Sequence, residues 1–256
     1  MTRVALFVAG LAGAFLAAFV VGRALDVGER TVADAHAAGA AHASALPGGL
    51  SLEQDGYRLV AERDELVAGR AEAFVFRILA PGGEVLRYYD VEHEKRLHLI
   101  VVSRPLGRFI HIHPRQRPDG AWTVSLKLPE NASYRAFADF TTGGERRTLG
   151  LDLEGNGGTR GAEDRLSRYD VSLHGHDDEL VFTVAGAGKP VELQPYLGAR
   201  GHLVVLREGD LAYIHAHADE ERLSFDVPFP SEGRYRLFLQ FKVGGKVETV
   251  SQAVTR

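Results

Sequence analysis

The sequence repeats one domain-sized pattern, and three histidines keep the same spacing in both copies. In each copy, twelve residues separate a single histidine from a His-x-His pair. Across the seventeen residues of this motif, the two copies are identical at six positions, and three of the six are the histidines. The histidines are His98, His111 and His113 in the first copy and His202, His215 and His217 in the second. Because imidazole is the commonest metal-ligand side chain, its retention in both copies indicates a chemical role.

The similarity continues beyond the histidines. Residues 134–148, YRAFADFTTGGERRT, match residues 235–249, YRLFLQFKVGGKVET, at seven of fifteen positions. The offset between the copies is 106 residues upstream of the histidines, 104 at the histidines and 101 in this downstream segment. Solenoid repeats are shorter, about 20–50 residues, whereas domains are commonly about 100 residues or more. The sequence therefore predicts two tandem domains.

After residue 50 the local pattern is that of β-strands. Short runs rich in Val, Ile, Phe, Tyr and Leu are separated by turn sequences such as Pro118-Asp119-Gly120 and Gly244-Gly245. Turn signals recur about every 8–12 residues, which favours a sandwich or barrel. Tyr134 and Tyr235 each open a late strand after a turn, as in a tyrosine corner. We expect an all-β chain of two immunoglobulin-like or cupredoxin-like β-sandwiches, with about seven strands in each.

Composition shifts define the expected boundaries. A polar, glycine-rich stretch separates the copies, and an Ala- and Gly-rich stretch ending in Pro47-Gly48-Gly49 precedes them. The expected organisation is an N-terminal anchor or signal segment at 1–26, a linker at 27–50, a first sandwich at 51–155, a connector at 156–165 and a second sandwich at 166–256.

Residues 4–22 form a run of nineteen uncharged, mostly apolar residues. A helix of this length is able to span the hydrocarbon core of a bilayer, about 30 Å thick. The run is longer than the usual apolar core of a signal peptide, which favours an uncleaved transmembrane helix, although A-x-A-like sites follow at 35–37 and 41–43. We therefore expect a single-pass protein of the cell membrane with extracytoplasmic domains, and a cleaved signal peptide is the alternative.

Composition excludes several kinds of chemistry. Cysteine is absent and the only methionine is Met1, so disulfides, thiolate nucleophiles, iron–sulfur clusters and blue-copper sites are ruled out. A net charge of −4 gives no electrostatic signal for nucleic acid. Any bound metal would meet imidazole and carboxylate ligands, which suit Zn(II), Cu(II) or Ni(II).

Strand alternation explains how the histidines would converge. His111 and His113 share one face of a strand, with Ile110 and Ile112 on the other, core-facing side. His98 begins the apolar run LIVV, which has the pattern of a neighbouring strand. We expect a three-histidine metal site in each copy, with the same arrangement around His202. Asp139, which aligns with Gln240, would add a carboxylate or orient a ligand. The competing interpretation is that the histidines are solvated or structural.

Other candidates are less specific. His174, His176 and the acidic residues after them have the composition of a solvated turn. His93 lies between two glutamates, which indicates a charge cluster on the surface. The spacing Gly209, His215, His217, Glu221 is similar to the first metal motif of cupins, but the later glycine and the second cupin motif are absent. The sequence also lacks Gly-x-Ser-x-Gly, P-loop and HExxH motifs. We therefore expect a protein that is not an enzyme.

The paired HLIVV, HIHP and YRAFADF segments and their second-copy counterparts carry a family resemblance. The chain resembles a poorly characterised family of exported or membrane-anchored proteins of high-GC bacteria, sometimes described as heavy-metal-associated. The resemblance covers most of residues 57–254. His113-Pro114 keeps the family's His-x-His-Pro, whereas Ala218 follows His217. It implies an envelope protein and supplies no mechanism.

Three functions remain open from the sequence. The first is an extracytoplasmic protein that buffers or delivers Cu(II) or Zn(II), with a metal ion and the membrane as its partners and no nucleic acid. The second is a non-catalytic structural or interaction module displayed on the cell envelope, for an unidentified protein partner. The third is a cupin-like metalloenzyme.

Overall fold

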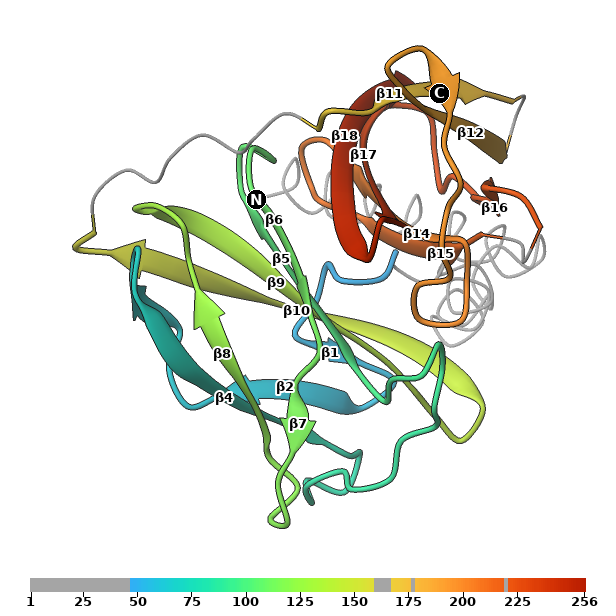
Figure 1. Ribbon diagram of the computed structural model, residues 1–256. Coiled ribbons are helices and arrows are strands. Elements are labelled where there is room, and N and C mark those ends of the chain that lie inside the picture. Colours follow the sequence, from blue (N-terminus) through green and yellow to red (C-terminus); the bar gives the residue numbers. More distant parts are fainter. Residues whose placement is uncertain (1–46, 159–166, 176–177, 219–220) are drawn as a thin grey trace, which may run out of the picture. The chain divides into compact units, whose positions relative to one another are not determined.

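The computed structural model describes residues 47–158, 167–175, 178–218 and 221–256. The expected membrane anchor, most of the linker and most of the connector lie outside these residues. Within the residues described, no helix has the length and hydropathy needed to cross a membrane. Residues 47–256 form one unit of β-strands (Figure 1).

The first repeat folds into a two-layer sandwich. One sheet has the order β1-β2-β4-β8-β7 and the other β3-β10-β9-β5-β6. Neighbouring strands are antiparallel except β3 and β10, which are parallel. The strands are β1 (Glu53–Gln54), β2 (Tyr57–Ala61), β3 (Glu65–Val67), β4 (Ala71–Leu79), β5 (His98–Ser103), β6 (Phe109–Ile112), β7 (Arg115–Gln116), β8 (Trp122–Lys127), β9 (Ala132–Thr142) and β10 (Glu145–Asn156).

The second repeat forms a sandwich of the same kind. One sheet has the order β11-β12-β13, with β16 also paired to β12, and the other has the order β15-β14-β17-β18. The strands are β11 (Asp170–His174), β12 (Glu179–Gly186), β13 (Lys189–Pro190), β14 (Gly201–Arg207), β15 (Tyr213–His217), β16 (Ser224–Asp226), β17 (Arg234–Val243) and β18 (Lys246–Thr255). In the described residues, short strands such as β1, β7 and β13 raise the totals above the seven expected per repeat.

The fold confirms two tandem β-sandwiches of immunoglobulin-like type. Each has the tyrosine corner that the sequence predicts. The Tyr134 hydroxyl donates to the carbonyl of Glu130 at 2.9 Å, and the Tyr235 hydroxyl donates to the carbonyl of Ser231 at 2.7 Å. Both tyrosine rings are fully buried. Because each ring ties a late strand to the turn before it, the register of β9 and β17 is fixed at the start of the strand.

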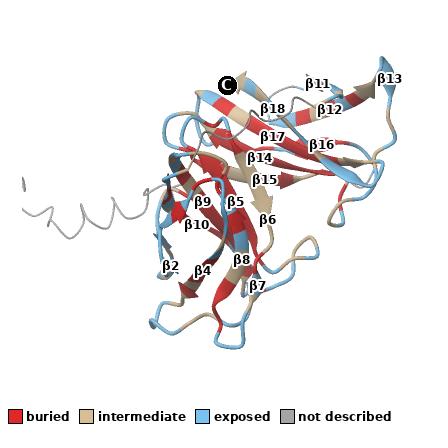
Figure 2. Cartoon of the chain, turned by 60° about the vertical axis from the view of Figure 1, so that its left-hand side comes forward, coloured by how far each residue is buried: buried red, intermediate tan, exposed pale blue. Residues whose placement is uncertain are grey.

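Strands β5 and β14 are buried on both faces, which is unusual for a two-layer sandwich. Leu99 and Val101 of β5 point into the core of the first sandwich. Ile100 and Val102 point the other way, into a separate apolar cluster that residues of the second sandwich share. A fully apolar strand such as LIVV is the sequence signature of burial on both sides. The outer faces of β5 and β14 therefore meet between the sandwiches, where Figure 2 shows them buried.

The contact between the sandwiches is reciprocal. Phe109 of the first repeat stacks on Phe238 of the second, with ring centroids 4.5 Å apart. Phe137 of the first stacks on Tyr213 of the second at 4.8 Å. In the alignment of the two repeats, Phe109 is equivalent to Tyr213, and Phe137 is equivalent to Phe238. The two aromatic pairs are therefore related by an approximate twofold axis, as in a self-complementary dimer interface.

We expect Phe238→Ala to destabilise the contact between the sandwiches as well as the chain. Removing a buried phenylalanine costs about 3–5 kcal/mol. Phe182→Ala, in the core of the second sandwich, is the control for a similar loss away from the contact. Guanidinium unfolding of metal-free protein, followed by tryptophan fluorescence and circular dichroism, should show separated transitions only in Phe238→Ala. Coincident transitions in both variants would contradict this role of the contact.

Candidate metal centre

All six repeated histidines lie on the faces of the two sheets that meet. On β5, His98 has the same side-chain orientation as Ile100 and Val102, because alternate residues of a strand share a face. Ile110 and Ile112 pack against the core of the first sandwich, so the histidines beside them face outward. In the second repeat, β14 and β15 pair directly through His202 and His217. The structure thus brings each set of three together in the way that strand alternation predicts.

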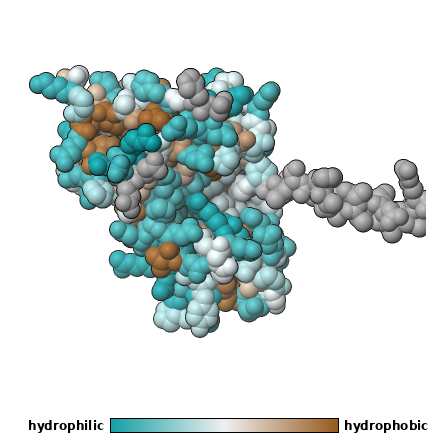
Figure 3. Space-filling model, turned by 90° about the vertical axis from the view of Figure 1, so that its right-hand side faces the viewer, coloured by the Kyte–Doolittle hydropathy of each residue, from teal (hydrophilic) through white to brown (hydrophobic). Residues whose placement is uncertain are grey.

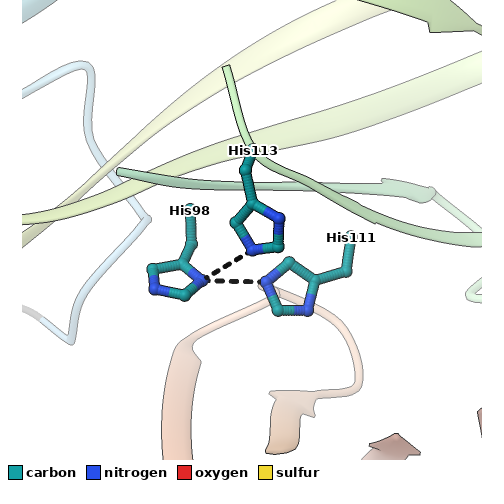
Figure 4. Close-up of side chains that lie close together, drawn as sticks. All are labelled: His98, His111 and His113. Atoms are coloured by element: carbon teal, nitrogen blue, oxygen red, sulfur yellow. Dashed lines mark hydrogen bonds between the residues drawn. The ribbon is translucent and has the colours of Figure 1, made fainter. Parts of the chain in front are cut away.

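The first set converges on Nδ1 of His98, as Figure 4 shows. This atom lies 3.0 Å from Nε2 of His111 and 3.2 Å from Nε2 of His113. Two nitrogens bound to one tetrahedral zinc ion at about 2.0 Å lie about 3.3 Å apart. Both distances from Nδ1 of His98 therefore match the spacing of ligands to a single small cation.

The second set presents three buried nitrogens without a hydrogen-bond partner. They are Nδ1 of His202, Nε2 of His215 and Nε2 of His217. The potential ligand atoms of this set lie within 4.8 Å of one another, as do those of the first set. A buried polar atom without a partner costs about 1–3 kcal/mol, so three together at one point call for a ligand.

Hydrogen bonds fix which nitrogen is free in several rings. Nε2 of His202 donates to the carbonyl of Tyr196 at 2.9 Å, which leaves Nδ1 as a bare lone pair. His98 interacts with the backbone of Glu92 in a similar way, and this interaction raises the pKa of His98. Nε2 of His98 nevertheless makes no hydrogen bond that meets the geometric criteria. Metal-bound histidines commonly donate their second ring N–H to a carbonyl or carboxylate in this way.

The two sandwiches orient each other's histidines. Nδ1 of His111 in the first repeat donates to Oε1 of Gln240 in the second at 2.7 Å. Nδ1 of His215 in the second donates to Oδ2 of Asp139 in the first at 2.8 Å. Asp139 and Gln240 occupy equivalent positions, opposite His98 and His202 on the neighbouring strands. The sequence pointed to Asp139 as an orienting residue, but the histidine that it orients belongs to the other repeat.

Asp139 is a buried carboxylate held in its charged form. Burial alone would raise its pKa, but the Arg146 guanidinium and the hydrogen bond from His215 outweigh burial and keep the pKa well below its ordinary value. Two nitrogens of Arg146 contact the two carboxylate oxygens at 3.0 and 2.6 Å. Thr148 adds a hydrogen bond at 3.1 Å. A permanent negative charge therefore lies behind His215 and makes its Nε2 a better ligand.

The histidines are held neutral. Burial lowers the pKa of His98 to about 4, with His111 adding to the effect. Burial, together with the neighbouring imidazoles, also lowers the pKa of His113 and of His202 to about 3. The pKa values of the other three shift in the same direction for the same leading reason. Because only a neutral imidazole binds a metal, these rings need no deprotonation at pH 7.

His93 joins the cluster, although the sequence suggested a surface charge group. Its ring stacks on His217 with centroids 3.4 Å apart and meets His202 edge-on at 5.8 Å. It has a positive φ of 47°, as does its counterpart in the second repeat, Leu197, at 51°. The matching loop conformation was not visible in the sequence, because the two segments share little identity there.

The remaining sequence candidates lie apart from the cluster. His174 is exposed, and neither it nor Glu221 belongs to a group of potential ligands among the described residues. Among the described residues, Glu221 is exposed and is not grouped with His215 and His217 as the cupin-like motif would require. His176 lies outside the described residues.

An open groove of about 850 Å³ borders the second set. His215 and His217 line it together with Arg146, Thr148 and Tyr213. Glu179 and Asp226 lie along its wall as well. The groove gives small ions a path to the histidines, and its carboxylates favour the approach of cations.

Comparison with known proteins shows one family. A model of the family described as a domain of unknown function (DUF8832) matches residues 52–157 and again residues 161–256. Among curated proteins, none matches the sequence.

Solved structures with related features are distant. The Escherichia coli adhesin FdeC is 15% identical, with a TM-score of 0.30, over 78% of this chain and 64% of that chain. A segment of two fibronectin type III domains from chicken tenascin is 11% identical, with a TM-score of 0.26, over 77% of this chain and 97% of that chain. A DUF4785 family protein from Legionella pneumophila is 14% identical, with a TM-score of 0.27, over 77% of this chain and 55% of that chain. Similarity at this level carries no argument about function.

We expect the metal-free protein to lose stability as the pH falls below about 6.5. In the unfolded chain histidines take up protons near that pH, whereas in the folded chain the pKa is about 4 for His98 and about 3 for His202. Because the pKa of these histidines is lower in the folded state than in the unfolded state, their contribution to the free energy of unfolding is fully present above the unfolded pKa. It is lost as the pH falls from the unfolded pKa toward the folded pKa. Each such histidine contributes about 1.4 kcal/mol per pH unit in that window.

Urea unfolding in EDTA at pH 7.5, 6 and 5 measures this effect. The double variant His98→Gln/His202→Gln should reduce the slope, and His174→Ala, on the exposed surface, should leave it unchanged. Equal slopes in all three proteins would show that the buried histidines do not govern the acid response.

Proposed function

The chain belongs to the DUF8832 family, with two copies of the domain in tandem, and we propose that it binds Cu(II) or Zn(II) through the histidine sets between its sandwiches. The observation that carries the proposal is the second set. There Nδ1 of His202, Nε2 of His215 and Nε2 of His217 are buried and unpartnered, and the potential ligand atoms of the set lie within 4.8 Å of one another. A cation bound to all three nitrogens would stabilise these neutral imidazoles, because they make no hydrogen bonds to one another at these atoms.

The ligand chemistry narrows the metal. Three imidazoles without thiolate or thioether suit Zn(II) and Cu(II) and disfavour the softer Cu(I). Three protein ligands also leave one coordination position for water or a small ligand. With the groove beside His215 and His217, such a site supports uptake and release better than permanent burial of the ion. We therefore assign the protein to metal buffering or delivery, without a catalytic step.

The location is part of the same proposal. The uncharged run at 4–22 supports a membrane anchor, with both sandwiches on the extracytoplasmic side. Oxidants modify thiols and thioethers before other side chains. Because the chain has no cysteine and no methionine other than Met1, its metal-binding side chains would stay unmodified in an oxidising compartment. Histidine ligands fit that setting.

The second candidate is a structural or interaction module. One observation favours it: His93 stacks on His217 in a neutral cluster that packs as aromatic rings do. Partner surfaces usually show a contiguous apolar patch. On the face in Figure 3, however, apolar residues gather in small areas interrupted by hydrophilic ones. Among the described residues, the exposed large hydrophobic side chains are Leu52, Val60, Val67, Tyr88, Val91 and Val247.

Calorimetric titration of the full-length chain in mild detergent tests the first proposal. We expect Cu(II) and Zn(II) to bind at one or two equivalents per chain at pH 7. His111→Ala/His215→Ala removes one ligand from each set and should abolish stoichiometric binding. His174→Ala removes an exposed histidine outside the cluster and should bind as the wild type does. Absent binding in the wild type, or binding unchanged in the double variant, would leave the structural module as the better account.

Asp139→Asn tests the orienting carboxylate separately. The amide keeps the size of the side chain but removes the charge behind His215, and such changes lower metal affinity by about 10–100-fold. The same titration measures this loss. Glu145→Gln, which removes an exposed carboxylate on β10, is the control and should bind normally. Equal affinities of Asp139→Asn and wild type would show that Asp139 does not support a metal ligand.

A further inference from the structure

We propose that the two histidine sets form one dinuclear metal centre, in which two ions share a bridging oxygen anion. This inference rests on the proposed metal binding and specifies its chemistry. Each ion would have three imidazole ligands, His98, His111 and His113 for one and His202, His215 and His217 for the other. The remaining position of each ion would be taken by the shared oxygen.

The six rings are one cluster by distance. Between the sets, the ring centroids of His98 and His215 lie 5.2 Å apart, those of His111 and His215 5.5 Å, and those of His111 and His202 6.0 Å. Within the sets, centroid separations reach 5.2 Å in the first and 5.8 Å in the second. Rings of different sets are thus in contact at nearly the same spacing as rings of one set, which leaves little material between two bound ions.

Hydrogen bonds to oxygen acceptors lie around the outside of this cluster. In His111, His202 and His215, one ring nitrogen is occupied by an oxygen acceptor, two of them across the domain contact. The other nitrogen of each ring faces the interior, where Nε2 of His111 lies 3.0 Å from Nδ1 of His98. A ring held at its outer nitrogen presents a lone pair of fixed direction to a metal. The two sets are therefore oriented as one assembly and not as two independent surfaces.

Charge makes the bridge necessary. Two divalent ions bring four positive charges to a place where the imidazoles are neutral and the charge of Asp139 is balanced by Arg146. Paired metals in proteins lie about 3.5–4 Å apart and are held by ligands that both ions share. A hydroxide supplies this when a metal-bound water releases one proton to the solvent. Its negative charge would lie between the two ions and offset part of their positive charge.

The groove beside His215 and His217 gives the small ligand a way in. It is bordered by Arg146, whose side chain is 38% exposed, and by Thr148 and Tyr213. Water, hydroxide and small anions reach the second set through this opening. A bridging ligand between the ions therefore exchanges with solvent, whereas the imidazoles stay in place.

Electron paramagnetic resonance of the full-length chain loaded with Cu(II) tests the proposal. Two Cu(II) ions that share an oxygen bridge couple their unpaired electrons, so the signal falls well below that of an equal amount of isolated Cu(II). We expect two ions per chain by metal analysis and this loss of signal. His113→Ala, which removes a ligand of the first set only, should bind one ion and restore the full signal per copper.

Two further variants complete the design. His217→Ala removes a ligand of the second set and should behave as His113→Ala does, so that a folding defect in one variant does not decide the result. His174→Ala, on the exposed end of β11, should keep both ions and the weakened signal. Circular dichroism of each protein checks that the sandwiches are intact.

The possible results separate the two proposals. Two bound ions with the full signal of isolated Cu(II), or a single bound ion in the wild type, would overturn the dinuclear centre and leave metal binding in place. No bound copper would overturn both. Two bound ions with a weak signal that either single-set variant restores would establish the centre.

Discussion

The packing of β5 and β9 against β14 and β17 is the contact on which the site depends. Each sandwich already buries one face of these strands in its own core, and the opposite faces meet each other. Apolar residues such as Ile100 and Val204 occupy the middle of the contact, and the histidines continue the same faces toward one end. Since the imidazoles lie on the buried side of β-sheets that face each other, desolvation keeps them neutral and close together. Without this contact, each set would lie on an exposed sheet.

The twofold relation between the repeats is obeyed by the packing and broken by the charges. Phenylalanine, tyrosine and threonine occupy equivalent positions in the two repeats. In contrast, Asp139 of the first repeat is equivalent to Gln240 of the second, and Arg146 is equivalent to Val247. The carboxylate supports a histidine of the second set, whereas only an amide supports the first. A charged acceptor raises the basicity of an imidazole more than a neutral one does. In the proposed metal centre, the second set would therefore bind a cation more tightly than the first.

Much of the architecture could be predicted from the sequence, and the reason is local. The repeat, the alternation at His111 and His113 and the tyrosine corners depend on neighbouring residues, and they led to two sandwiches with three histidines together in each. The sequence did not predict that the two sets meet. That arrangement depends on which sheet faces of the two sandwiches pack together, which is a long-range contact. The apolar runs LIVV and LVVL indicate only that their strands are buried on both faces. His93 was missed for a related reason, because its loop reaches the other repeat.

The form of the contact explains why the chain carries two copies. In a self-complementary interface, residue i meets residue j and residue j meets residue i. Phe109 on Phe238 and Phe137 on Tyr213 satisfy this relation, as do His111 with Gln240 and His215 with Asp139. Two separate copies of one domain would have to place the same side chain at both orienting positions. Joining them in one chain keeps the interface at high effective concentration and frees those positions to differ. Asp139 with Arg146 on one side and Gln240 on the other is such a difference, and it lies directly behind the histidines.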